Sequence, residues 1–119
     1  MTDKTEIFKA VSEPNRVRIL LMLLDKPLCV CEITSILKLS TATVSNHLSY
    51  LKQIGFVSDR KDGKWINYQI KEDIDNTIIL TILDNLKEWF KNETDIINDN
   101  TAVKTVDRYS IICNGKTLS

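Results

Sequence analysis

Two cysteines separated by one residue are the feature of this 119-residue sequence that most clearly could bind a metal ion or react. Cys29 and Cys31 are followed at once by Glu32. In extended backbone the side chains of residues i and i+2 point to one side, so both sulfurs could bind one soft ion, whereas in a helix they lie about 200° apart. Chelation therefore requires an extended or unwound segment where the next helix begins. A helix N-terminus also favours the thiolate, an effect that Glu32 partly opposes.

The cysteine pair has other interpretations. Free cysteine is among the most buried residue types, so the two could simply be small core residues. They could also form a strained disulfide or a persulfide and act as a redox switch. A thiol oxidoreductase is disfavoured because no βαβ pattern surrounds the pair. Cys113 lies in a polar tail and is either an incidental thiol or a further metal ligand.

A helix predicted over residues 41–54 could read DNA. Ser40 or Thr41 would cap this helix, and Gly55 would end it. One face is apolar and would fix the helix to a core. That face consists of Val44, Leu48 and Leu51. The opposite face is expected to be small, polar and free of acids, as contact with the major groove of DNA requires. Its predicted members are Thr41, Thr43, Ser45, Asn46, His47 and Tyr50.

Single side chains on this polar face suggest base contacts. Asn46 could pair with adenine, and the threonine methyl groups could touch thymine. His47 is the one histidine of the chain, so no second imidazole exists to complete a zinc site. We expect it to be either a DNA contact or a packed helix residue. The alternative for the whole face is an ordinary amphipathic helix with a solvated outer side.

The residues after this helix predict a two-stranded hairpin. Residues 57–60 and 66–70 alternate apolar and polar side chains around Asp62 and Gly63, a strong turn signal. Basic side chains around the tip are expected to contact DNA phosphates. They are Arg60, Lys61 and Lys64, with Lys52 at the end of the preceding helix.

The remaining elements complete a winged helix-turn-helix, mainly α with a small β hairpin. Periodicity predicts helices over residues 5–11, 14–25 and 32–37, with Ser12 as the cap of the second. Two helices joined by a short turn and followed by a hairpin have the order of that fold.

A long helix over residues 74–90 has an apolar face broader than one small core requires, which indicates a homodimer. We therefore expect residues 1–91 to form the DNA-binding and dimerisation domain. Residues 92–119 are polar and weakly periodic, and we expect a frayed helix or a tail there.

Charge and composition limit the function further. Residues 14–71 carry nine basic and four acidic side chains, whereas residues 72–100 carry two and eight. This asymmetry could place a polyanion on one face, although an uneven charge distribution is also common on surfaces that contact only solvent. The longest apolar run has six residues and there is no apolar leader, so we expect a cytoplasmic chain that does not contact the membrane. With three glycines and no phosphate loop or nucleophile turn, it is not expected to be an enzyme.

Taken together, these motifs resemble the ArsR family of metal-responsive repressors, and more closely its arsenic-sensing branch. The matching segments are residues 28–33, 39–48 and 59–68. The resemblance implies a homodimer that binds operator double-stranded DNA when metal-free and dissociates when As(III) or Sb(III) binds Cys29 and Cys31. It implies no permanent cofactor.

The sequence also departs from that family. The arsenic-sensing branch often has a third cysteine where this chain has Thr34, so Cys113 could replace it, or the site could have two thiolates only. Zinc-sensing relatives place Asp and His pairs on the last long helix, but residues 74–90 contain no His. Cadmium and lead sensors add an N-terminal cysteine, and residues 1–28 contain none.

Overall fold

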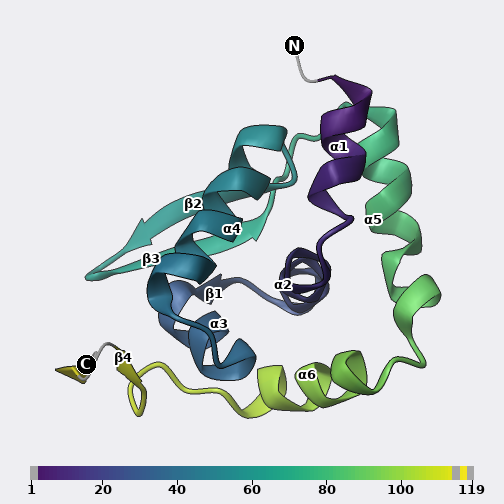
Figure 1. Ribbon diagram of the computed structural model, residues 1–119. Helices are drawn as coiled ribbons and strands as arrows, with labels where there is room; N and C mark the ends of the chain where they lie inside the picture. Colours follow the sequence, from purple (N-terminus) through teal and green to yellow (C-terminus); the bar gives the residue numbers. More distant parts are fainter. Residues whose placement is uncertain (1–2, 114–115, 118–119) are drawn as a thin grey trace.

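The computed structural model describes residues 3–113 and 116–117, and it confirms the mainly helical winged fold. In chain order the elements are α1 (Lys4–Ala10), α2 (Pro14–Asp25), β1 (Leu28–Cys29), α3 (Val30–Leu37), α4 (Thr41–Ile54), β2 (Val57–Asp62), β3 (Trp65–Ile70), α5 (Thr77–Phe90), α6 (Thr94–Thr105), β4 (Ile112–Cys113) and β5 (Lys116–Thr117). Helix α2 is seen end-on near the centre of Figure 1, with α4, α5 and α6 packed around it. The sequence predicts α2 correctly because a helix that is apolar on most sides belongs in the centre of a small core.

The start of α2 differs from its prediction in one detail. The cap is not Ser12 but Glu13, whose carboxylate accepts the backbone N–H groups of Asn15 at 3.2 Å and Arg16 at 3.1 Å. The Ser12 hydroxyl instead donates to the Lys9 carbonyl at 2.8 Å. A carboxylate at this position satisfies two N–H groups and lies at the positive end of the helix dipole.

The sheet contains one strand more than the predicted hairpin. Its antiparallel order is β1-β3-β2, with Leu28 opposite Tyr68 and Cys29 opposite Asn67. The hairpin between β2 and β3 turns at Gly63, whose φ of 61° suits glycine. Two-residue β1 is too short to give an alternating pattern, so the sequence could not reveal it. Through β1, the cysteine segment is joined directly to the wing.

Within the segment predicted as a frayed helix or a tail, residues 94–105 form an ordered helix instead. Helix α6 is regular, and it buries Ile96, Asp99 and Val103. The Asp99 carboxylate accepts two hydrogen bonds from Arg18 of α2, at 2.8 Å and 2.9 Å, and these raise the pKa of the Arg18 guanidinium. This partner lies 81 residues away in sequence, so the periodicity of the segment itself contains no sign of it.

Helix α5 begins later than the predicted residue 74 because Asn76 caps it, accepting the N–H groups of Ile78 at 3.0 Å and Ile79 at 3.1 Å. Helices α1 and α5 lie side by side in Figure 1. Among the described residues, no helix is long and apolar enough to cross a membrane.

Candidate nucleic-acid interface and thiol site

Helix α4 presents a polar outer face, as the sequence predicts, but with different members. Its inner face buries Val44, Leu48 and Leu51, and the Ser40 hydroxyl caps the helix by accepting the Thr43 N–H at 3.1 Å. Thr41 and Ser45 are half-buried. The exposed side chains are Ala42, Thr43, Asn46, Ser49, Lys52 and Gln53. The prediction missed Ala42, Ser49 and Gln53, although they lie four residues before, three after and seven after Asn46, a helical spacing that places them on the same face.

His47 and Tyr50 do not belong to that outer face. The His47 side chain is 16% exposed, with Nδ1 3.4 Å from the Arg16 guanidinium and Nε2 3.4 Å from the Glu13 carboxylate. The Tyr50 hydroxyl donates to Glu6 at 3.1 Å, and the Arg16 guanidinium lies 4.5 Å from the Tyr50 ring centroid. Each of the two residues is close in angle to the buried stripe of α4. They therefore anchor α4 to α1 and α2: His47 is a packed helix residue, one of its two predicted roles, and Tyr50 faces α1 rather than the outer side of α4.

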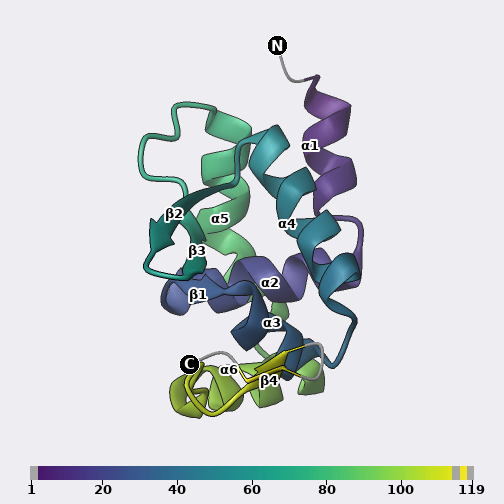
Figure 2. The ribbon, with the colours of Figure 1, turned by 90° about the vertical axis from the view of Figure 1, so that its left-hand side faces the viewer.

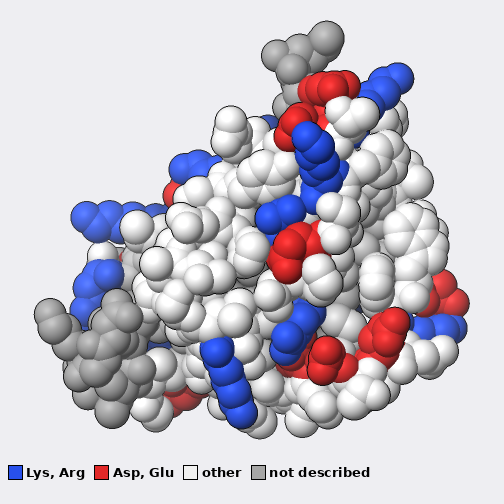
Figure 3. All heavy atoms as spheres, viewed as in Figure 1, with Lys and Arg blue, Asp and Glu red and all other residues white. Residues whose placement is uncertain are grey.

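The tip of the hairpin is basic. Arg60, Lys61 and Lys64 are exposed, and Figure 3 shows Lys and Arg side chains gathered over the end of the hairpin at the left of the view. The predicted phosphate contact Lys52 is exposed but lies 3.0 Å from the Asp59 carboxylate, which raises its pKa and offsets its charge. Helix α4 and the hairpin adjoin each other in both ribbon views.

Cys29 and Cys31 lie together in a small buried cluster with Trp65 and Ile111 around them. Cys29 ends β1 in extended backbone, with φ −86° and ψ 165°, and is the N-cap of α3. Cys31 lies in the first turn of that helix. Of the two cysteines, only Cys29 therefore lies in the predicted extended segment, and the helix begins one residue later.

The environment of Cys29 does not favour the thiolate. Burial raises the pKa of the Cys29 thiol, and the neighbouring Glu32 carboxylate raises it further, while backbone N–H groups act in the opposite direction. Glu32 is itself buried, and its carboxylate accepts the Cys29 N–H at 2.9 Å. The expected stabilisation by the helix N-terminus is therefore outweighed, and the thiol is protonated at neutral pH.

A third ligand is not in place beside the pair. Within residues 3–113 and 116–117, no group of three or more His, Cys, Asp or Glu side chains is arranged to hold a metal ion. Cys113 belongs to β4, whose backbone lies against α3 (Figure 2), but its side chain lies outside the described residues. Two buried polar atoms, Thr34 Oγ1 and Trp65 Nε1, have no hydrogen-bond partner in the described part of the chain.

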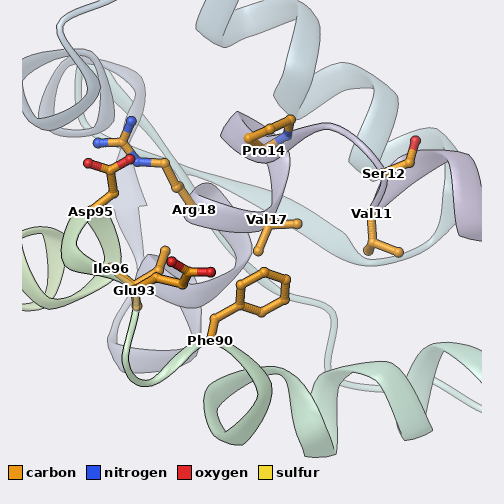
Figure 4. Close-up of a pocket in the computed structure, with 9 residues that line it drawn as sticks. All are labelled: Val11, Ser12, Pro14, Val17, Arg18, Phe90, Glu93, Asp95 and Ile96. Carbon is orange, nitrogen blue, oxygen red and sulfur yellow. The ribbon is translucent and has the colours of Figure 1, made fainter.

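A hollow lies elsewhere, between α2 and the junction of α5 with α6. It has a volume of about 310 Å³. Figure 4 shows Phe90 directed toward Val17, with Arg18 and Asp95 at one end and Ser12 at the other. Because Ser12 and Asp95 lie at opposite ends, the Asp95 carboxylate is not placed to act as a general base for the Ser12 hydroxyl.

Comparisons with known proteins agree with this arrangement. A sequence profile described as "Bacterial regulatory protein, arsR family" matches residues 13–59. The Cadmium resistance transcriptional regulatory protein CadC homolog of Staphylococcus aureus is 42% identical over 72 residues, which are 60% of each chain. The Arsenic resistance transcriptional regulator ArsR1 of Pseudomonas putida is 31% identical over 87 residues, 70% of this chain and 68% of that protein.

Among solved structures, HlyU from Vibrio cholerae N16961 superposes with a TM-score of 0.64 at 31% sequence identity. The superposition covers 74% of this chain and 91% of HlyU. The chain spans less than two thirds of the staphylococcal relative and slightly more than two thirds of the Pseudomonas one. Both of those relatives are named as regulators of transcription rather than as enzymes.

Proposed function

Because this chain belongs to the bacterial ArsR family of regulatory proteins, we propose that it is a homodimeric repressor that binds operator DNA when metal-free and dissociates when As(III) or Sb(III) binds Cys29 and Cys31. The observation that carries this proposal is the place of the cysteine pair. Cys29 pairs with Asn67 of wing strand β3, and Cys31 lies in the first turn of α3, the helix before α4. An ion bound there acts on the wing and on the helix-turn-helix together.

DNA binding is supported by the polar face of α4 and the basic wing. In this docking α4 enters the major groove with Asn46 near base edges, and the wing cations contact phosphates. The exposed residues Ser49 and Gln53 extend the surface available for base contacts.

Dimerisation is supported by apolar side chains that α1 and α5 leave exposed. Phe8 is 56% exposed, Leu80 37% and Trp89 59%. A two-fold dimer over these helices would address two half-sites about one helical turn apart. Leu83 is buried within its own protomer, so Leu80→Glu is the better disruption, with Thr81→Glu on an exposed neighbouring position as its control. Sedimentation of Leu80→Glu as a dimer would contradict the interface.

The chemistry of the thiols favours a trivalent arsenical over a divalent cation. Arsenous acid, As(OH)₃, condenses with two thiols to give (RS)₂AsOH and two waters: As–S bonds replace As–O bonds, and the thiol protons leave in water. Cd²⁺ must instead displace protons into solvent, which the raised pKa of Cys29 opposes. Cd²⁺ would also require ligands beyond two thiolates, and the described residues provide no third one beside them.

The pH dependence of binding tests this preference. Displacing the proton of the Cys29 thiol would raise Cd²⁺ affinity by about 10-fold per pH unit. Arsenite condensation releases no net proton, so its affinity should be nearly constant between about pH 6 and 8. Cd²⁺ and arsenite are each titrated into phosphine-reduced protein at several pH values, and binding is followed by the ultraviolet absorbance of the new metal–sulfur bonds. The two series give the dependence of each affinity on pH. A steep slope for arsenite would contradict the condensation.

Release from DNA is the direct test of the function. A labelled duplex selected in vitro by the wild-type protein reports binding by fluorescence anisotropy. Arsenite should release the wild type, whereas Cys29→Ser and Cys31→Ser should bind DNA normally and remain bound. Ser35→Ala, at an exposed position of α3, is the matched control and should respond like the wild type. Full release of Cys29→Ser by arsenite would overturn the sensing site.

Cys113 is the third candidate ligand, since β4 lies against α3. X-ray absorption of bound As(III), without added thiols, tests this role: two sulfurs in the wild type would match (RS)₂AsOH, whereas three in the wild type and two in Cys113→Ser would identify Cys113 as the third ligand. Three sulfurs in both proteins would exclude Cys113 as a ligand.

A redox or persulfide switch is the second candidate, because both cysteines lie in one buried cluster. Release by a dithiol oxidant or a persulfide donor, with no response to arsenite, would favour that function over arsenic sensing.

A further inference from the structure

The segment after α6 returns across the molecule and binds the wing. The Arg108 guanidinium donates to the Asp62 carboxylate at 2.7 Å and to the Asn67 side-chain oxygen at 3.0 Å. It also lies over the Trp65 ring, 4.1 Å from the centroid, and Tyr109 meets the same ring edge-on with centroids 5.0 Å apart. We call Arg108, Tyr109 and Ile111 the C-terminal clasp.

The same segment covers the thiols. Ile111 packs against Cys29 and Cys31, and Trp65 packs against them as well. The two cysteines are only 2% and 7% exposed. Trp65 therefore contacts the cysteine pair and, through its ring, Arg108, so that the thiol site and the wing share one set of neighbours.

The clasp changes the charge of the wing. Asp62 lies between the basic residues Lys61 and Lys64 at the tip, where its carboxylate would repel phosphate. The ion pair with Arg108 lowers the pKa of Asp62 and raises that of Arg108, so both stay ionised and neutralise each other. With the clasp closed, the cations of the wing tip are unopposed.

An arsenical at the thiols is incompatible with this closed arrangement. Interiors are packed too closely to admit an additional arsenic atom and its hydroxyl without displacing a neighbour. Trp65 is held in β3 by pairing with Asp62 of β2, whereas Ile111 lies in an irregular segment between α6 and β4. Ile111 is therefore the neighbour that is displaced. Arg108 lies three residues before it, so displacement of Ile111 also moves Arg108.

We propose that the C-terminal clasp couples the thiol site to the wing: Arg108 neutralises Asp62 and holds the wing in its DNA-binding state, and inducer bound at Cys29 and Cys31 displaces Ile111 and breaks the Arg108–Asp62 pair. The second half rests on the proposed function, but the first half needs no inducer. Arg108 is thus a positioning residue for DNA binding, and it acts through Asp62.

A double-mutant cycle without inducer tests the first half. Arg108→Ala should weaken binding to the in vitro-selected duplex by about 3- to 10-fold, because it leaves the wing carboxylate unopposed. In the Asp62→Asn background the same change should cost less than about twofold. Lys104→Ala removes an equivalent exposed charge from α6 and should behave like the wild type. Equal losses in both backgrounds, or the same loss in Lys104→Ala, would overturn the neutralising role.

Hydrogen exchange with arsenite tests the second half. Arsenite should increase exchange of residues 106–111 in the wild type and leave Cys29→Ser unchanged. If arsenite releases the wild type from DNA but exchange over 106–111 does not change, the clasp is wrong and arsenic sensing stands. If arsenite neither binds the protein nor releases it from DNA, arsenic sensing fails. The double-mutant cycle of Arg108 and Asp62 then still decides whether the clasp supports DNA binding.

Discussion

Helix α4 buries Val44, Leu48, Leu51 and Ile54 in the core, whereas Val57 is the one buried side chain in strands β2 and β3. The two regions that we propose to contact DNA are therefore held by different means. Helix α4 is fixed by apolar packing and by polar contacts to α1 and α2. The wing is held by its pairing with β1 and by Arg108 from the far end of the chain.

This difference assigns different roles to the two regions. Moving α4 would disrupt the core, so an inducer that binds with modest energy cannot readily shift it. The wing strands bury only Val57 of their own residues, so the wing can change position at a smaller cost in buried contacts, and its pairing with β1 lies beside the thiols. Regulation is therefore expected to act mainly on the wing, and base recognition mainly on α4.

The largest effect is expected from Leu48→Ala, which removes a fully buried side chain from α4. It should lower the free energy of unfolding by about 2–5 kcal/mol, because the cavity adds to the lost transfer free energy. Urea denaturation followed by circular dichroism measures the change. Ser49→Ala, one residue further and exposed, should stay within about 0.5 kcal/mol of the wild type. A small loss in Leu48→Ala would mean that α4 is not fixed by the core.

Asp99→Ala should lower the free energy of unfolding by about 2–3 kcal/mol, because it leaves the Arg18 guanidinium without its buried partner. Hydrogen exchange should rise in α6 and in the clasp more than in α4. Asn98→Ala, at an exposed position of the same helix, is the control. Uniform destabilisation of α4 and α6 together would remove the contrast between the two regions.

Variants on α4 and on the wing should affect DNA binding in different ways if both contact DNA as proposed. Asn46→Ala on α4 should cost about 1–3 kcal/mol at one base position and relax preference there. Lys64→Ala on the wing should weaken all sequences alike and lower the salt slope by about one unit. Binding to base-substituted duplexes at several salt concentrations measures both. If Lys64→Ala altered base preference, the wing would also read sequence.

The smallest effect is expected from Tyr50→Phe, which removes the hydroxyl that donates to Glu6. The loss should be about 0.5–1.5 kcal/mol of stability with base preference unchanged. The melting temperature of the variant measures the loss of stability, and in vitro selection of DNA measures its base preference. A change in preferred sequence would return Tyr50 to the DNA-facing side of α4.

The local pattern determined most of the elements. Pro14, Ser40, Gly55 and the turn at Gly63 mark boundaries through backbone conformation and capping, which act within a few residues. The periods of α2, α4 and the hairpin likewise depend on near neighbours. The cysteine pair and the basic wing tip were visible for the same reason, since residue types and spacing are properties of the sequence itself.

Tertiary structure alone decided what lies against those elements. The turning of His47 and Tyr50 toward α2 and α1, the burial of Cys29 that raises its pKa, and the packing of α6 on Arg18 depend on groups distant in sequence. The same holds for the contact of Arg108 with Asp62, 46 residues earlier. Burial, ion pairing and pKa are set by neighbours in space, and a local pattern contains no information about which distant side chain the folded chain places beside a given residue.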